Sequence, residues 1–396
     1  MLHPSPFSSL PIPSIYIHIP FCKQKCNYCD FVSYARKEDL IDDYVEALIK
    51  DISSQFSNLY FPLSTIYFGG GTPTLLKPKH FEKILKALES RKLKADSRAQ
   101  EVSIEANPGT VSLEFLKKLH NIGINRLSLG AQSFNDKYLK YLGRIHNSKQ
   151  IYQAFENAKE AGFENINLDL IFAIPGQTLE EWKEDLAEAL SLKPEHLSTY
   201  NLQIEEGTPL WGNTKSEILN PKQIPISKSK IINEDLDANM YELTIETLTS
   251  VGFKHYEISN FAKPGFECQH NINYWKMGNW LGIGAGAHSH VNGKHWENTS
   301  NVEEYIGSGG VRRNGCRLAP DVSHDLPAGR QGATDQRETL FMGLRLLDGI
   351  NKAHFIGFEK EIVELKQQGL LEESGDNIRL TKKGLFLGNL VFEKFV

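Results

Sequence analysis

Residues 16–31 read YIHIPFCKQKCNYCDF, and the interpretation of the whole chain starts from this stretch. Its cysteines are Cys22, Cys26 and Cys29, in the spacing C-x3-C-x2-C, with Tyr28 directly before the third thiol. Three thiolates on one short loop can hold three irons of a cubane, whereas a [4Fe–4S] cluster normally takes four cysteines. No fourth cysteine is nearby in the sequence. The spacing therefore predicts a cluster whose fourth iron is open to a ligand that is not protein.

Two other uses of these thiols match the pattern less well. A structural zinc site prefers two cysteine pairs, or cysteines combined with histidines, and here no second pair follows, while His18 lies before the loop. A disulfide framework is a poor alternative because the chain has an odd count of 5 cysteines and no recognisable secretion signal. The cluster is therefore the expected use of the three thiols.

The composition is that of an ordinary globular protein. Of the 396 residues, 40% are hydrophobic and 23% are charged, and the formal net charge is −5. This charge gives no indication of nucleic-acid binding, and no apolar run approaches the roughly 20 residues that a membrane helix needs. The N-terminus lacks the basic start and long apolar core of a signal peptide. We expect a cytoplasmic protein without a transmembrane segment.

Strands and helices alternate through the first half of the chain. Short β-rich runs are expected at 14–19, 65–68, 101–105, 125–129, 166–171 and 197–202. Helical periodicity is expected at 39–56, 78–88, 113–120, 148–161 and 179–192. About six βα units with right-handed crossovers predict an α/β fold, in which a parallel sheet with outer helices curls into a closed or open barrel.

The second half of the chain reads as separate parts. A helix is expected at 234–250. After it, the pattern indicates helices at 338–346 and 358–368, a hairpin at 370–381 and a last helix. This order of elements predicts a small winged-helix-like α+β domain. The expected division is an N-terminal arm at 1–14, a core barrel at 15–212, a linker helix with two conspicuous motifs at 213–306, a flexible loop at 307–337 and the C-terminal domain at 338–396.

Glycine-rich and polar segments follow the expected strands one after another. They are GGGTPT at 69–74, EANP at 105–108, GAQSFN at 130–135 followed by Arg144, and LDLI at 168–171, which contains Asp169. Loops at the C-terminal ends of barrel strands build the active site, so we expect these segments to surround the cysteine loop. Each residue alone is also compatible with an ordinary cap or surface pair. The order across successive strands is much more specific.

These residues together resemble the radical S-adenosylmethionine (SAM) enzymes. In that family the amine and carboxylate of SAM chelate the open iron, and one electron from the cluster cleaves SAM to a 5′-deoxyadenosyl radical. The resemblance implies a partial (β/α)6 barrel. Over essentially the whole chain, the quoted segments are similar to the oxygen-independent coproporphyrinogen III oxidase family. This similarity implies SAM-site roles for Tyr16, Tyr28, Gly70, Gly71, Thr72, Glu105, Gln132, Arg144 and Asp169.

The chain also departs from those oxidases, which carry a further cysteine two residues after the third cluster thiol and a long N-terminal extension. Here Phe31 takes the place of that cysteine, and only a short arm precedes the first expected strand. Both differences resemble the HemW-type branch of the family, which is understood as a haem chaperone. The segments HNINYW at 270–275 and GIGAGAHS at 282–289 are similar to that branch.

Histidine is a normal axial ligand of haem, so His270 is the expected haem ligand and His288 the next candidate. The leading expectation is a haem chaperone with a [4Fe–4S] cluster, SAM and haem as cargo, which passes haem to an acceptor protein. The alternative is an oxygen-independent coproporphyrinogen III oxidase, and a third possibility is a radical enzyme with another substrate. No catalytic residue is predicted beyond the cofactor-binding positions.

Overall fold

The computed structural model describes residues 14–55, 63–90, 101–215, 233–310 and 331–395. Three expected segments lie wholly or mostly outside the described residues: the N-terminal arm, the polar linker after residue 213 and the long loop within 307–337. Within the described ranges, no helix is both long and apolar enough to cross a membrane.

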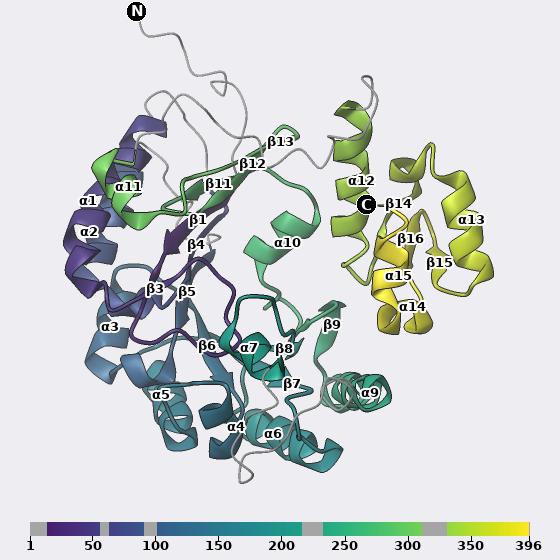
Figure 1. Cartoon of the computed structure of the whole chain (residues 1–396), viewed down its shortest axis with the longest axis horizontal. Helices are drawn as coiled ribbons and strands as arrows, with labels where there is room; N and C mark the ends of the chain where they lie inside the picture. Colours follow the sequence, from purple (N-terminus) through teal and green to yellow (C-terminus); the bar gives the residue numbers. More distant parts are fainter. Residues whose placement is uncertain (1–13, 56–62, 91–100, 216–232, 311–330, 396) are drawn as a thin grey trace, which may run out of the picture.

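Six parallel strands form the centre of one large sheet and are neighbours in chain order (Figure 1). They are β1 (Ser14–Ile19), β4 (Thr65–Gly70), β5 (Glu101–Ala106), β6 (Arg126–Gln132), β7 (Asn165–Phe172) and β8 (His196–Asn201). All six expected strands are therefore confirmed, and so is the α/β radical SAM-type architecture. Parallel pairing brings the C-terminal ends of all six to the same edge of the sheet, where the site lies.

Helices cover the outer face of this sheet (Figure 1). The expected helices are α1 (Ile41–Gln55), α2 (Pro78–Ser90), α3 (Leu113–Asn121), α5 (Ser148–Glu160) and α6 (Leu179–Ser191). Their starts are encoded locally: Asn147 and Thr178 each form a capping box, with Gln150 and Glu181. Shorter helices in the connections are η1 (Glu38–Leu40), η2 (Pro73–Leu75), η3 (Pro108–Thr110), α4 (Asp136–Tyr141), α7 (Pro209–Lys215) and α11 (Val302–Gly307).

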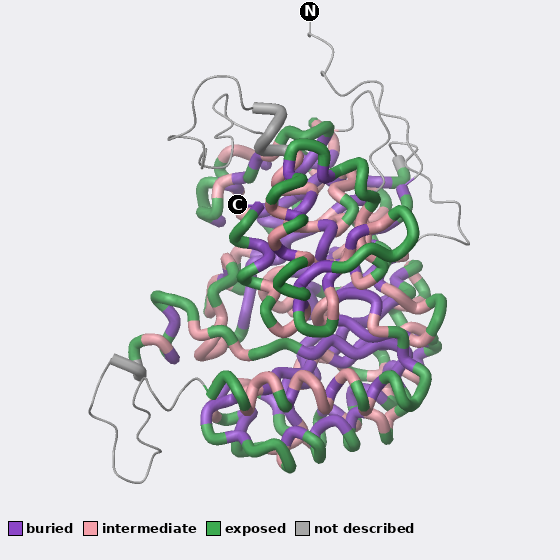
Figure 2. Tube along the Cα trace, turned by 90° about the vertical axis from the view of Figure 1, so that its right-hand side faces the viewer, coloured by how far each residue is buried: buried purple, intermediate pink, exposed green. Residues whose placement is uncertain are grey.

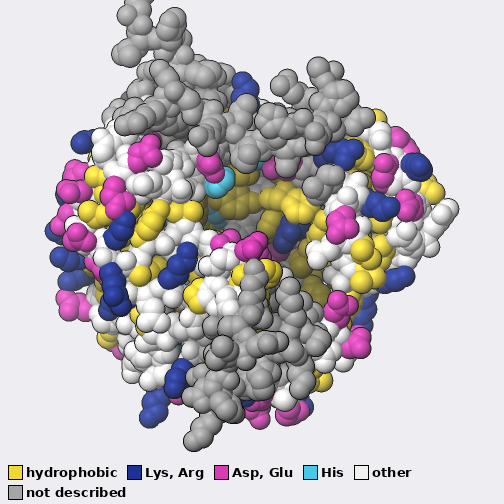
Figure 3. All heavy atoms as spheres, in the orientation of Figure 1, with side chains coloured by type: hydrophobic (Ala, Val, Ile, Leu, Met, Phe, Trp, Pro, Cys, Tyr) yellow, Lys and Arg dark blue, Asp and Glu magenta, His cyan; other side chains and the backbone are white. Residues whose placement is uncertain are grey.

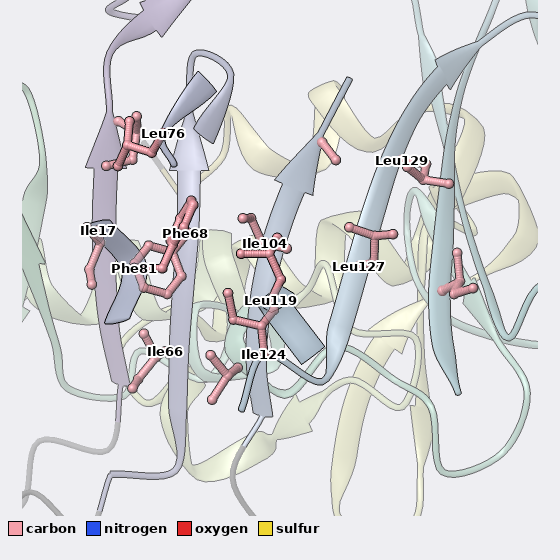
Figure 4. Close-up of a cluster of buried hydrophobic side chains, with 14 of the residues drawn as sticks. Ile17, Ile66, Phe68, Leu76, Phe81, Ile104, Leu119, Ile124, Leu127 and Leu129 are labelled. Carbon is pink, nitrogen blue, oxygen red and sulfur yellow. The ribbon is translucent and has the colours of Figure 1, made fainter. Parts of the chain in front are cut away.

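The main core lies between the sheet and these helices (Figure 4). Side chains such as Ile17, Phe68 and Ile104 leave neighbouring strands on the same side and meet Phe81 of α2 and Leu119 of α3. The Phe68 and Phe81 rings meet edge to face, with centroids 5.2 Å apart. Burial of one such side chain stabilises the fold by about 1.5–3 kcal/mol. Figure 2 shows the resulting contrast between buried sheet segments and the exposed outer turns of the helices.

Residues 254–297 extend the sheet at both edges, which the sequence pattern did not predict. On one side β11 (Trp280–Ile283) runs parallel to β1 and continues into β12 (His288–Val291) and β13 (Lys294–Glu297). On the other side β10 (Asn260–Ala262) pairs antiparallel with β8, and β9 (Lys254–Glu257) pairs antiparallel with β10. Strands of three or four residues offer too short a window for periodicity to reveal them. The expected linker helix is confirmed as α9 (Glu234–Ser250).

The C-terminal residues form a second, smaller core beside the barrel (Figure 1). Its elements are α12 (Gln331–Gly343), β14 (Ile350–Asn351), η4 (Lys352–Phe355), α13 (Glu359–Gln367), β15 (Leu371–Ser374), β16 (Asn377–Leu380), α14 (Lys382–Phe386) and α15 (Gly388–Phe392). The expected hairpin is confirmed as β15–β16, while two short helices replace the single last helix. Backbone hydrogen bonds from Ile258 to Arg345 and from Leu347 to Tyr256 join this domain to the sheet edge.

Candidate functional site

A cavity of about 560 Å³ opens at the C-terminal ends of the parallel strands. Figure 3 shows the hollow in the middle of that view, with hydrophobic and charged side chains inside it. Most of the residues predicted for the cofactor site line this cavity: Cys22, Cys26, Cys29, Tyr28, Gly70, Gly71, Thr72, Glu105, Gln132, Arg144 and Asp169. The fold therefore brings together residues that are up to 147 positions apart in the sequence, from Cys22 to Asp169.

The cysteine loop is held by two anchors. At its start, β2 (Phe21–Cys22) pairs with β3 (Tyr34–Ala35), which closes the loop on itself. In its middle, the backbone N–H and side-chain amide of Asn27 donate to the carbonyls of Leu142 and Tyr141, at 3.0 and 2.7 Å. A short turn, in which Cys29 N–H donates to Cys26 O at 3.2 Å, follows this second anchor. These bonds fix where the three thiols enter the cavity.

Hydrogen-bond donors stand beside the sulfur atoms. Thr72 Oγ1 donates to Cys22 Sγ at 3.6 Å, and Arg144 Nη1 donates to Cys26 Sγ at 3.2 Å. Burial raises the pKa of the Cys22 and Cys29 thiols, so their thiolate forms need a bound cation. In the described residues, no three His, Cys, Asp or Glu side chains are grouped tightly enough for one metal ion. Three sulfurs around a cavity, with donors beside them, fit a larger thiolate-bound group.

The glycine-rich turn after β4 packs against the cysteine loop. Gly70 has φ +111, and a Cβ there would meet the His18 ring at 2.5 Å. A Cβ on Gly71 would meet Phe21 O at 2.7 Å and Cys22 Sγ at 3.0 Å. Both positions therefore need glycine, the first for its left-handed backbone and the second for the close approach. The turn forms part of the cavity wall directly beside the first cysteine.

Two carboxylates face the cavity from β5 and β7, the strands on either side of β6. Glu105 accepts hydrogen bonds from Tyr67 Oη at 3.0 Å and from Gly70 N–H at 3.2 Å. Burial, assisted by the charge of Asp169, raises the pKa of Glu105 to about 7. Asp169 accepts from Ser128 Oγ and Asn167 Nδ2, at 3.0 and 2.8 Å, and burial raises its pKa as well. The pair provides a negatively charged wall for a cationic ligand.

Gln132 lines the cavity, and its backbone has a left-handed conformation that is unusual for a residue other than glycine. Its φ is +68, and the pairing of β6 with β7 is irregular at this point. The next two residues are tied to Asp185 of α6, which accepts from Ser133 Oγ and Phe134 N–H, both at 2.7 Å. Burial raises the pKa of Asp185 to about 6. Sequence reasoning missed Asp185, although an acid at an inward-facing position of a helix, beside Trp182 and Leu186, was a usable signal.

Tyr16 and His270 do not line the cavity. Tyr16 lies behind the cavity wall, where its ring stacks on Tyr67 with centroids 6.2 Å apart. His270 is fully buried, and its Nδ1 is 2.7 Å from Oγ1 of Thr65, the residue that begins β4 at the opposite end of the sheet. Its Nε2 is 2.8 Å from Tyr274 Oη.

Both ring nitrogens of His270 are therefore occupied, and burial lowers its pKa to about 3. This arrangement does not favour the predicted role of His270 as a haem ligand, and that role stays a prediction. Cys268, which precedes the motif, is also buried and donates to Glu101 at 3.5 Å.

Comparisons with known proteins agree with this geometry. The Radical SAM superfamily model matches residues 16–189, and the HemN C-terminal domain model matches residues 334–387. The solved structure of coproporphyrinogen III oxidase (HemN) from Escherichia coli superimposes with a TM-score of 0.75, covering 97% of this chain and 90% of that one at 22% identity. The fold and the family match define a radical SAM protein, a class that binds a [4Fe–4S] cluster and SAM.

Curated relatives narrow the family further. The protein named heme chaperone HemW from Lactococcus lactis is 38% identical over 97% of both chains. The proteins of that name from Bacillus subtilis and Escherichia coli are 37% and 36% identical, over 97% and 98% of this chain and 99% of theirs. The chain belongs to the HemW family of radical SAM proteins.

Proposed function

We propose that this protein is a haem chaperone, which binds haem and transfers it to haem-requiring proteins. The observation that carries the proposal is the near full-length similarity to three relatives that are named heme chaperones. A cytoplasmic location and a protein acceptor of haem are parts of the same proposal.

Cys22, Cys26 and Cys29 are proposed to hold three irons of the cluster, with SAM on the fourth. When bound, the cluster supplies one electron for SAM chemistry. Thr72 Oγ1 and Arg144 Nη1 would stabilise the thiolates through the hydrogen bonds that they donate to the sulfurs.

The cavity wall at the ends of β4 to β7 supports a SAM site. The carboxylates of Glu105 and Asp169 would face the positive charges of SAM, and the carbonyls around Gly70 and Gly71 would accept from its amino group. Gln132 adds a carboxamide to the same wall, Tyr28 adds an aromatic face, and Tyr16 supports Tyr67 from behind. Apart from Tyr16, these groups all line one cavity at the C-terminal ends of the strands.

The mouth of the cavity supports a cargo that is large and apolar. Phe31, Ile145 and Tyr200 all line the cavity and are exposed, and Phe31 is 69% exposed. Exposed apolar side chains at the rim of a pocket mark a binding surface. Phe31 also occupies the position at which the oxidases have a further cysteine. This difference favours the haem chaperone over an oxidase.

A pair of assays separates the chaperone from a coproporphyrinogen III oxidase. We expect the purified, cluster-loaded protein to bind haem with a Soret band and to form no protoporphyrinogen IX from coproporphyrinogen III, SAM and a reductant. A known oxidase assayed in parallel serves as the positive control. Robust product formation would overturn the chaperone proposal in favour of the oxidase.

Asp185 is expected to influence SAM binding without contacting the ligand. A residue held at an unusual φ stores about 1–3 kcal/mol of strain, and the bonds to Asp185 hold the segment that follows Gln132. Asp185→Ala should therefore weaken SAM binding about tenfold, while Asp185→Asn, which keeps an acceptor for Phe134 N–H, should lose less. Equilibrium dialysis with SAM measures both, at unchanged iron content. Equal affinity in all three proteins would show that Gln132 does not depend on this anchor.

A further inference from the structure

Four histidines of the barrel are poorly placed to bind haem. His18, His146, His196 and His270 are buried, and hydrogen bonds occupy both ring nitrogens of each. None of these four can bind a haem iron without giving up a buried hydrogen bond, which costs about 1–3 kcal/mol. His288 is different, because 62% of its side chain is exposed.

His288 lies at the same end of the sheet as the cysteine loop. It begins β12 directly after the loop that follows β11, and β11 runs parallel to β1, which leads into the cysteine loop. Gly286 in that loop packs on Val32, since a Cβ on it would meet the Val32 side chain at 3.0 Å. Val32 directly follows Phe31, the exposed aromatic residue at the cavity mouth.

The surroundings of His288 also suit a metal ligand. Its Nε2 is 3.5 Å from Oε2 of Glu297, the residue paired with it on β13. Metal-binding histidines commonly give their second ring N–H to a carboxylate, which orients the ring and strengthens the ligand. In the part of the chain that the structure describes, no hydrogen bond is found at Nδ1 of His288, so this nitrogen is available to iron.

The positively charged side chain of Lys25 lies next to Phe31. Lys25 is exposed, and its Nζ donates to the carbonyl of Phe31 at 3.2 Å. Haem is flat and apolar and carries an iron and two propionates, so a complementary surface offers an axial ligand, an apolar face and a positive charge. His288, Phe31 and Lys25 supply one of each, on the cysteine loop and on the start of β12, whose preceding loop packs on Val32.

We propose that His288 is the axial ligand of the haem cargo, with Phe31 against the porphyrin face and Lys25 beside a propionate. This inference rests on the proposed haem-chaperone function and moves the ligand from His270 to His288. Haem in this place lies at the mouth of the cofactor cavity, outside the SAM site.

Haem titration of the full-length, cluster-loaded protein tests the proposal. His288→Ala should shift the Soret maximum and weaken haem binding about tenfold or more, which corresponds to at least about 1.4 kcal/mol. His354→Ala, which removes an exposed histidine of the C-terminal domain, is the matched control and should bind like the wild type. Phe31→Ala should weaken binding while keeping the wild-type Soret position, because the iron ligand is still present.

The outcomes of this titration are distinct. A wild-type protein without a Soret band would defeat the proposed function itself. Normal haem binding and an unchanged spectrum in His288→Ala would leave the function standing and overturn this site. Iron content and the SAM-induced change of the cluster's EPR signal should be the same in His288→Ala and the wild type, which excludes misfolding as the cause of a loss.

Discussion

Replacing Cys26 by alanine is expected to abolish the [4Fe–4S] cluster. The change leaves two thiolates where three irons need protein ligands, and it removes the sulfur that accepts from Arg144 Nη1 at 3.2 Å. After anaerobic reconstitution, iron analysis and EPR should show little iron and no cluster signal. Cys22→Ala and Cys29→Ala should give the same result.

Cys268→Ala is the matched control for these variants. Cys268 is buried, and its thiol contacts Glu101 at the start of β5, at the end of the sheet away from the cavity. Its loss should leave the cluster intact. The fifth cysteine, Cys316, lies outside the described residues. Full cluster content in Cys26→Ala would refute the assignment of the three thiols.

Replacing Glu105 by glutamine is expected to weaken SAM binding about ten- to a hundredfold. Glutamine keeps the size of the side chain and an acceptor for Tyr67, but it removes the negative charge that faces the cavity. A hydrogen bond to a charged group contributes roughly 1.5–3 kcal/mol. Titration of the cluster's EPR signal with SAM gives the affinity. Glu114→Gln, on the exposed surface of α3, should bind SAM normally.

The same carboxyl group predicts a pH dependence. Burial raises the pKa of Glu105 to about 7, so the group is ionised above this pH and takes up a proton below it. Since only the ionised form attracts the cationic SAM, the affinity of the wild type should fall as the pH is lowered from 8 to 6. Glu105→Gln should be less dependent on pH over this range. Equal slopes for both proteins would show that Glu105 does not control binding.

Much of the barrel could be predicted from the sequence because its units are regular. The first five of the six expected strands (β1, β4, β5, β6 and β7) are each followed by an amphipathic helix before the next of them, and α5 and α6 begin with a capping box. The edge strands β9 to β13 escaped prediction because they are short, and because β10 and β11 attach to the sheet by pairing with β8 and β1, far away in the chain. The secondary-structure preferences of a short segment do not reveal which distant strand it will pair with.

The sequence by itself determined the spacing of the thiols on which the cluster prediction rests. Three thiols within eight residues stay close in any fold of that loop, so the spacing of Cys22, Cys26 and Cys29 was sufficient to predict the ligand set. The order of the polar segments also placed Glu105 and Asp169 on one edge of the sheet, because parallel strands end on the same side.

Only the tertiary structure decided which side chains are accessible and which are occupied. His270 looked available in its motif, yet Thr65, 205 residues away in the chain, occupies one of its ring nitrogens. His288 looked weaker, yet 62% of its side chain is exposed. Burial and hydrogen-bond occupancy depend on contacts between distant segments, and a residue's neighbours in sequence do not encode them.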